Sequence, residues 1–176
     1  MRLARLRELD VAGVRRVRTL PHPRAVQDAL VLLSRATDHS DAWILGALAG
    51  AACDRRRRDQ WLAAGSRVAL VEVSSRLIKR VVPRPRPQID DLPALAPTPS
   101  PMSFPSSHTA AAVAAISAFD ELLPGVLLRT AAAVTAFSRL YLGVHYPSDV
   151  LAGAAIGHVV ARTPHPLPRA DDGEAI

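Results

Sequence analysis

Three short clusters in the 176-residue chain combine side chains that can bind and cleave a phosphate ester. The first, residues 79–87, is rich in cations, and the second, residues 104–108, lies where a helix is expected to begin. The third, residues 138–149, holds an arginine, a histidine and an aspartate. Arginine offers paired donors to phosphate oxygens, lysine supplies a compact charge, and a helix N-terminus presents free N–H groups. If the helix ends converge, these groups form a pocket for a phosphate dianion.

The two histidines of these clusters are suited to nucleophilic and acid–base catalysis. Asp149 follows His145 by four residues, and Pro147 fixes the chain between them at a helix start. A carboxylate there can accept a hydrogen bond from one imidazole nitrogen and leave the other nitrogen as a nucleophile. His108 then remains as a candidate proton donor to the leaving group. Each cluster taken singly is better explained by a solvated loop, a helix cap or a surface ion pair, and only their ordered combination indicates catalysis.

Together the clusters resemble the signature of the type 2 phosphatidic acid phosphatase (PAP2) superfamily, which also includes bacterial acid phosphatases and vanadium haloperoxidases. That signature reads Lys, six residues, Arg-Pro; then Pro-Ser-Gly-His; then Ser-Arg, five residues, His, three residues, Asp. The matching residues are Lys79, Arg86, Pro87, Pro105, Ser106, His108, Ser138, Arg139, His145 and Asp149. Ser107 replaces the glycine, at a position that the family uses mainly through its backbone N–H.

The resemblance implies a reaction in two steps. His145 is the nucleophile that forms a phosphohistidine, Asp149 orients it, and His108 protonates the leaving oxygen and later activates water. The phosphate oxygens are expected to be held by Lys79, Arg86, Ser106, Ser107 and Arg139. The resemblance implies no metal and no other cofactor, and the chain lacks the clustered carboxylates that a magnesium or two-metal phosphatase needs.

Helices must position these clusters, because apolar segments alternate with proline-rich and charged stretches and no strand pattern is present. We predict an all-α fold, a polytopic membrane helical bundle of about five to six helices with a PAP2/haloperoxidase-like core. The expected helices are residues 25–37, 42–53, 60–80, 107–120, 123–140 and 147–162. They form a phosphatase domain, 25–162, between a basic amphipathic N-terminal segment, 1–24, and a tail, 163–176, that is predicted to be disordered. The N-terminal segment could lie on an anionic membrane or in solvent.

Hydropathy does not settle whether the helices cross a membrane, because no run reaches the roughly 20 apolar residues of a span. Alanine-rich, glycine-containing helices with few charges nevertheless favour close packing in a bilayer. The four arginines of residues 55–58 are expected on the cytoplasmic side. All three clusters then meet on the extracytoplasmic face, although an inverted protein would bring them together equally. The proline-rich loop 88–103 is a candidate lid or lipid entry edge, or a linker.

The net charge of +6 suggests an anionic partner, but an aromatic content of 4% offers few stacking platforms for nucleic acid. The single cysteine, Cys53, excludes an internal disulfide and a multi-cysteine metal site. The short length resembles the bacterial, actinobacterial-like membrane branch of the superfamily.

We therefore predict a metal-independent lipid phosphate hydrolase of the bacterial inner membrane. The candidate substrates are phosphatidate, phosphatidylglycerol phosphate, polyprenyl diphosphates and decaprenyl-phosphoryl phosphoribose. Membrane lipids are the other expected partners, nucleic acid is not expected as a partner, and an oligomer is left open. The alternatives are a soluble acid phosphatase of the same superfamily and a non-enzymatic basic protein that binds membranes or nucleic acid.

Overall fold

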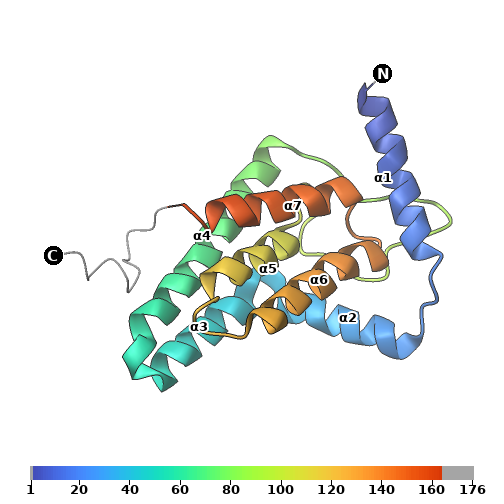
Figure 1. Ribbon diagram of the computed structural model, residues 1–176. Helices are drawn as coiled ribbons and strands as arrows, with labels where there is room; N and C mark the ends of the chain where they lie inside the picture. The colour runs from blue at the N-terminus through green and yellow to red at the C-terminus, as the bar shows by residue number, and fades with distance from the viewer. Residues whose placement is uncertain (1, 164–176) are drawn as a thin grey trace.

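The structure, a computed structural model, describes residues 2–163, and its secondary structure is helical (Figure 1). The α-helices are α1 (Arg2–Arg18), α2 (Arg24–Ala36), α3 (Asp41–Cys53), α4 (Arg58–Val81), α5 (Ser107–Ala118), α6 (Gly125–Tyr141) and α7 (Pro147–Val160). Two short 3-10 helices, η1 (Asp38–Ser40) and η2 (Arg55–Arg57), flank α3. The all-α prediction is confirmed for these residues, and the predicted tail beyond residue 163 lies outside them.

The helix bounds agree closely with those expected from the sequence, because prolines and charge runs mark the ends of apolar segments. Seven α-helices are present in the described part: α2 to α7 correspond to the six helices expected in residues 25–162, and α1 lies in the predicted amphipathic N-terminal segment. Helix α1 packs against α6 and α7. Val14 of this helix is 1% exposed and Asp10 is 2% exposed, while the N-terminal half projects beyond the other helices (Figure 1).

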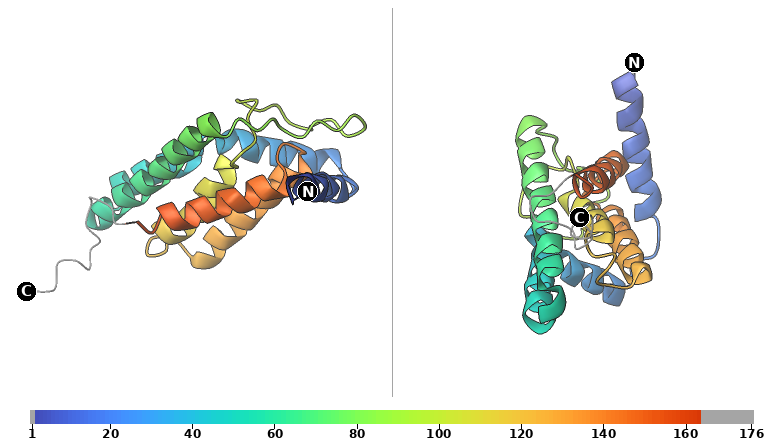
Figure 2. Two further views of the ribbon diagram at one scale, coloured as in Figure 1. Left: turned by 90° about the horizontal axis from the view of Figure 1, so that it is seen from above. Right: turned by 60° about the vertical axis from the view of Figure 1, so that its left-hand side comes forward.

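The short helix α5 lies at the centre of the bundle, between α4 on one side and α6 and α7 on the other (Figure 2). Its inner positions are alanines, and the core continues into valines of α4 and Phe119 at the end of α5. Alanine side chains keep the helix axes close together. The N-terminus of α5, which carries the second cluster, is therefore held beside the ends of its neighbours.

Two glycines explain how closely α7 approaches α5. A β-carbon on Gly153 would collide with the carbonyl oxygen of Ser106, and one on Gly157 would collide with the carbonyl oxygen of Ala110. The pair forms a small-residue motif of the G-x-x-x-G type, which lets two helix backbones touch. This contact places the start of α7, with Asp149, against the start of α5, where the amide of Ser106 donates to the main-chain oxygen of Asp149 at 3.1 Å.

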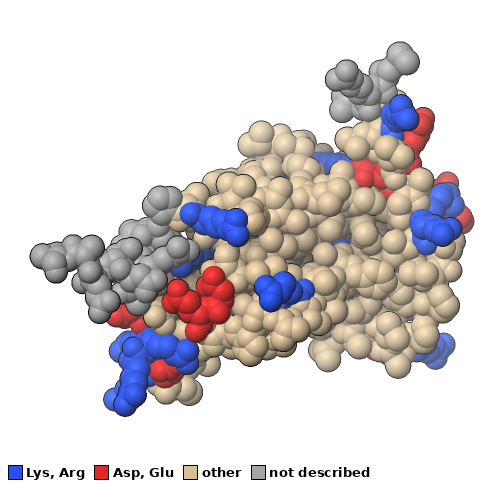
Figure 3. Space-filling model, viewed as in Figure 1, with Lys and Arg blue, Asp and Glu red and all other residues tan. Residues whose placement is uncertain are grey.

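The outer surface of the bundle carries many large apolar side chains. Exposed examples on α3, α4, α6 and α7 are Leu45, Leu48, Leu70, Val73, Leu77, Val126, Leu127, Phe137, Leu151 and Val159. On the face in Figure 3, charged side chains are sparse in the middle and gather toward the ends. Among the described residues, no helix has both the length and the apolar character required to cross a membrane.

Candidate active site

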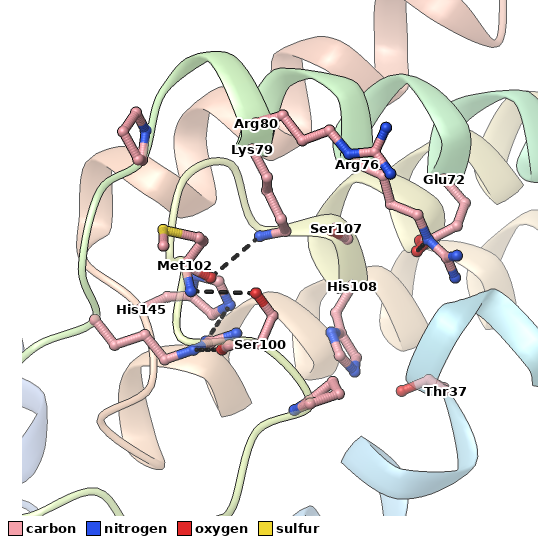
Figure 4. Close-up of a pocket in the computed structure, with 13 residues that line it drawn as sticks. Thr37, Glu72, Arg76, Lys79, Arg80, Ser100, Met102, Ser107, His108 and His145 are labelled. Atoms are coloured by element: carbon pink, nitrogen blue, oxygen red, sulfur yellow. Dashed lines mark hydrogen bonds and ion pairs between the residues drawn. The ribbon is translucent and has the colours of Figure 1, made fainter.

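A cavity of about 500 Å³ opens between α4, the start of α5, the end of α2 and the loops that follow α4 (Figure 4). Its walls are formed by Thr37, Glu72, Arg76, Lys79, Arg80, Pro83, Arg86, Pro99, Ser100, Met102, Ser107, His108 and His145. Three other residues expected at the site, Ser106, Arg139 and Asp149, are buried around this cavity. The structure therefore brings the three sequence clusters together.

His145 lies in the turn between α6 and α7. Gly143 adopts a φ of 70°, a left-handed conformation that glycine reaches without strain and that ends α6. The amides of Val144 and His145 both donate to the main-chain oxygen of Arg139, at 3.1 and 3.3 Å. This turn fixes the backbone of His145, and the residue is only 2% exposed.

The neighbours of His145 select one tautomer of its neutral imidazole. Its Nε2 lies 3.1 Å from Nη1 of Arg86, and a guanidinium can only donate, so Nε2 carries the lone pair. The proton is then on Nδ1, which faces Oδ2 of Asp149 across 3.7 Å. That separation exceeds a hydrogen bond, and Nδ1 has no other partner in the described chain. A small approach of the two side chains would complete the pair.

Asp149 is fully buried and is held by more than the histidine. Its Oδ2 accepts from the amide of Tyr146 at 2.9 Å, and its Oδ1 accepts from Nη1 of Arg84 at 2.7 Å. Burial opposes its ionisation, but contact with His145, the Tyr146 amide and the Arg84 charge outweigh burial and hold the pKa of Asp149 below its usual value. Asp149 is therefore an anion beside Nδ1 of His145.

Burial is also the main reason that His145 stays neutral. It lowers the pKa of His145 to about 3, helped by the charges of Arg86, Arg139 and Lys79 and opposed by Asp149. At neutral pH Nε2 is therefore unprotonated; its lone pair accepts from Arg86 in this structure and can attack an electrophile once Arg86 donates to the substrate instead.

This shift predicts that the protein loses stability in acid. In the unfolded chain His145 takes up a proton near its ordinary pKa of 6.5, whereas in the folded chain it does so only near 3. Its contribution to the free energy of unfolding is thus complete above pH 6.5 and falls as the pH drops toward 3. We expect the Tm of the wild type to fall more steeply between pH 7 and pH 4 than that of His145→Gln.

The control for this measurement is His158→Gln, because His158 is an exposed histidine of α7. Its Tm should follow the wild type at every pH. Parallel curves for the wild type and His145→Gln would contradict a buried neutral histidine at position 145.

His108 lies in the first turn of α5, on the opposite side of the cavity. Its Nε2 is 3.0 Å from Oδ1 of Asp38 and 3.2 Å from the main-chain oxygen of Ser34. Both partners can only accept, so Nε2 bears a proton and Nδ1 is left for a ligand. The pKa of His108 lies below its usual value, because burial outweighs the opposing effect of Asp38. Asp38 thus supports the protonated form of a buried histidine.

The cations of the site are held mainly by neutral oxygens, which leaves their charge uncancelled. Nζ of Lys79 donates to the carbonyl of Pro105 at 2.6 Å, and Nε of Arg86 donates to the carbonyl of Ser100 at 2.8 Å. Arg139 is 2% exposed and donates to the hydroxyl of Ser34. Burial, followed by the charge of Arg86, lowers the pKa of Lys79 to about 8. Such a concentration of positive charge favours an anion.

The two serines at the start of α5 differ in their availability. Ser106 is fully buried, and its hydroxyl pairs with that of Thr109 at 3.0 Å. Ser107 lines the cavity as the first residue of the helix. Its φ is not positive, since Ser40 is the only non-glycine residue with positive φ in the described chain. The position that is glycine in the family signature therefore accommodates serine without backbone strain.

Several residues around the site were not predicted from the sequence. Ser34 and Asp38 contact His108, and Arg84 and Asp10 form ion pairs behind Asp149. Asp10, Ser34 and Asp38 lie outside the three clusters, and Arg84 lies within the first cluster at a position that the signature does not specify. No spacing pattern links these residues to the histidines. Among the described residues, no group of His, Cys, Asp and Glu is placed to hold a metal ion; metal independence stays a prediction.

Two solved structures share this architecture. A transmembrane PAP2 type phosphatidylglycerolphosphate phosphatase from Bacillus subtilis aligns with a TM-score of 0.72 and 22% identity, covering 89% of this chain and 82% of that one. LpxE from Aquifex aeolicus aligns with a TM-score of 0.70 and 24% identity, covering 87% of this chain and 92% of that one. At these identities the likeness establishes the fold.

Comparison of sequences identifies the family as well as the fold. A Mycobacterium tuberculosis protein named decaprenylphosphoryl-5-phosphoribose phosphatase is 44% identical over 135 residues, which are 73% of this chain and 72% of that protein. The protein of the same name from Mycolicibacterium smegmatis is 42% identical over 125 residues, 69% of this chain and 67% of that protein. The PAP2 superfamily profile matches residues 60–169, which include all three clusters. Since that match covers most of the chain, the protein belongs to the PAP2 superfamily and hydrolyses phosphate esters.

Proposed function

We propose that this protein removes the terminal phosphate from a lipid-linked phosphosugar of the decaprenylphosphoryl-5-phosphoribose type, through a phosphohistidine on His145. The observation that carries the proposal is the state of His145, which is buried and neutral, with Nε2 against Arg86 in a cationic cavity. A neutral imidazole at that place can attack phosphorus directly.

In the first step Nε2 of His145 attacks phosphorus, and the bond from phosphorus to the leaving oxygen breaks. In this step His108 must be protonated on both ring nitrogens; it keeps the Nε2 proton beside Asp38 and gives the Nδ1 proton to that oxygen, so the sugar leaves as an alcohol. Asp38 stabilises His108 while it carries the proton, and Asp149 accepts from Nδ1 of His145 as that ring becomes positive. Formation of the phosphohistidine therefore requires one neutral and one protonated histidine.

In the second step the roles reverse. Neutral His108 takes a proton from water, the water oxygen attacks phosphorus, and the bond from phosphorus to Nε2 of His145 breaks. Inorganic phosphate leaves, and both histidines return to their starting states. Lys79, Arg86 and Arg139 stabilise the charge on the phosphoryl oxygens in both steps, where preorganised cations act most strongly.

The part of the cavity beyond His108 supports a hydroxylated leaving group. Its polar side chains include Thr37, Glu72 and Arg76, which lie away from His145 (Figure 4). Glu72 is 8% exposed, and its two oxygens accept from Nε of Arg76 at 2.8 Å and from Ser40 at 3.2 Å. A carboxylate and hydroxyls with unused lone pairs can bind sugar hydroxyls. A diacylglycerol leaving group would offer few groups to satisfy them.

The exposed apolar side chains of α3, α4, α6 and α7 support a protein that works in contact with lipid. We propose that it acts at the bacterial cell membrane, with the cavity on the extracytoplasmic side. A soluble acid phosphatase of the same superfamily would instead remain in the aqueous fraction without detergent, and this partition separates the two candidates.

The experiment is a phosphate-release assay in detergent with four substrates: a polyprenylphosphoryl-5-phosphoribose, phosphatidate, phosphatidylglycerol phosphate and a polyprenyl diphosphate. We expect kcat/KM for the phosphoribose lipid to exceed that for phosphatidate by about tenfold or more, with no loss on adding EDTA. Glu72→Gln should lower the ratio of kcat/KM for the phosphoribose lipid to kcat/KM for phosphatidate. A requirement for added Mg²⁺, or equal kcat/KM for all four lipids, would contradict the proposal.

A further inference from the structure

The N-terminal helix α1 contacts the start of α7 through one buried carboxylate. Asp10 is 2% exposed, although it belongs to a helix whose other charged residues mostly face outward. Its Oδ1 accepts from the amide of Ser148 at 2.9 Å, and its Oδ2 accepts from the hydroxyl of Ser148 at 2.6 Å. A carboxylate at the start of a helix is favoured by the free amides there. Asp10 therefore fixes α1 to the first turn of α7.

Arg84 joins this contact to the catalytic pair. Its Nη2 donates to Oδ2 of Asp10 at 2.7 Å, and its Nη1 donates to Oδ1 of Asp149 at 2.7 Å. The guanidinium carbon lies 4.1 Å from the centre of the Tyr146 ring, within cation–π range. The two ends of one planar group are thus shared between two buried carboxylates, which fixes the orientation of both.

The contacts of Asp149 show what this arrangement accomplishes. Arg84 occupies Oδ1, so the other oxygen, Oδ2, is turned toward the Tyr146 amide and toward Nδ1 of His145. Without Arg84 only the Tyr146 amide would hold the carboxylate, so the position of Oδ2 relative to Nδ1 of His145 would be less defined. The Arg84 side chain itself is 24% exposed. Besides Asp149 it is held by Asp10, through Nη2, and by the hydroxyl of Ser148, which accepts from Nη1 at 2.7 Å.

We propose that Asp10 and Arg84 are positioning residues for Asp149, so that α1 completes the active site. The inference rests on the proposed phosphohistidine chemistry, because it assigns the two residues to the aspartate that supports the nucleophile. The N-terminal helix α1 would then support catalysis by helping to hold Asp149, in addition to any contact that it makes with a membrane or solvent.

Arg84 and Asp10 carry opposite charges and should therefore shift the pKa of Asp149 in opposite directions. A purely structural role of the two residues would produce no such pair of shifts. The charged and titratable groups around Asp149 are Arg84, Asp10, His145, Tyr146, Lys79 and Arg86. The Arg84 charge lowers the pKa of Asp149, so removing it should let Asp149 hold a proton to higher pH. Removing the Asp10 charge leaves Arg84 facing Asp149 alone, so Asp149 should become more acidic.

The test measures kcat, KM and the pH dependence of kcat for folded, full-length variants in detergent. We expect Arg84→Met to lower kcat by about 100-fold with little change in KM, and to move the acid limb of the pH profile to higher pH. Asp10→Asn should lower kcat by about tenfold and move that limb to lower pH or leave it in place. Arg84→Lys should recover part of the lost kcat.

Matched controls lie on the same helix. Glu8→Gln removes an exposed carboxylate from α1, and Arg16→Met removes an exposed arginine; both should match the wild type. Wild-type kcat and pH profile in folded Arg84→Met and Asp10→Asn would overturn the inference while leaving the proposed function intact. The inference would also be overturned if the acid limb of the kcat profile moved in the same direction in both variants. A loss of kcat fully explained by a smaller folded fraction would overturn it as well. A wild type that forms no phosphoenzyme would instead refute the proposed function.

Discussion

Replacing His145 with glutamine is expected to abolish phosphate release from a lipid phosphate, with a fall in kcat of about 10⁴-fold or more. Glutamine keeps the volume and polarity of the site but has no lone pair that can form a stable phosphoramidate at the position of Nε2. The surrounding cations would still bind the substrate, so KM should change much less than kcat. Water would have to attack phosphorus without a covalent intermediate.

The measurement compares single-turnover phosphate release by the wild type, His145→Gln and the control His158→Gln. His158 is exposed on α7 and pairs with Arg162 at 2.8 Å, remote from the cavity residues. The control should retain wild-type activity. Full activity in His145→Gln would exclude His145 as the nucleophile.

The second large effect is expected for His108→Asn, with a fall of about 10² to 10⁴-fold in the hydrolysis of an alkyl lipid phosphate. An alkoxide is a poor leaving group and needs the proton that His108 supplies. p-Nitrophenolate needs no such proton, so His145 of the variant should still be phosphorylated by p-nitrophenyl phosphate. Hydrolysis of the phosphoenzyme would remain slow, because neutral His108 also activates the water.

A burst experiment tests this directly. His108→Asn should release one equivalent of p-nitrophenol quickly and then turn over slowly, while its activity on the lipid substrate is low from the first turnover. Equal losses on both substrates, with no burst, would contradict the role of His108 as proton donor. His158→Gln again serves as the histidine control.

The sequence was sufficient to predict the helices and to select the three clusters. Prolines and charge runs mark the ends of the apolar segments, so the bounds of α2 to α7 lie close to those expected. Spacing within a cluster is a local property. The four-residue separation of His145 and Asp149 keeps the two side chains near each other regardless of how the rest of the chain folds. The clusters converge because the end of α4, the start of α5 and the start of α7 lie side by side.

Contacts between distant elements could not be predicted in this way. Asp10 is one polar residue among many in a basic helix, and only the docking of α1 onto α7 reveals that it is buried. Asp38 lies between two expected helices, with no motif to mark it, yet η1 places it 3.0 Å from His108. Arg84 is one of several cations in residues 79–87, and its two carboxylate partners lie on helices at opposite ends of the sequence.

Ser106 illustrates a limit of transferring a residue's role through a motif. It was expected to hold the phosphate, but its hydroxyl pairs with Thr109 and its amide donates to the main-chain oxygen of Asp149. In this arrangement Ser106 joins α5 to α7, and a contact with phosphate would require its hydroxyl to turn. The motif identifies the residue, whereas packing between the two helices determines which atoms are free.

The most direct test of the account is to trap the covalent intermediate. Wild-type protein mixed with a lipid substrate labelled in its terminal phosphate, and quenched in alkali within one turnover, should carry label on a peptide that contains His145. The label should be stable in alkali and lost in acid, as expected for a phosphohistidine, and His145→Gln should carry none. Turnover with no label on the wild-type protein, or label that persists in His145→Gln, would contradict nucleophilic catalysis by His145.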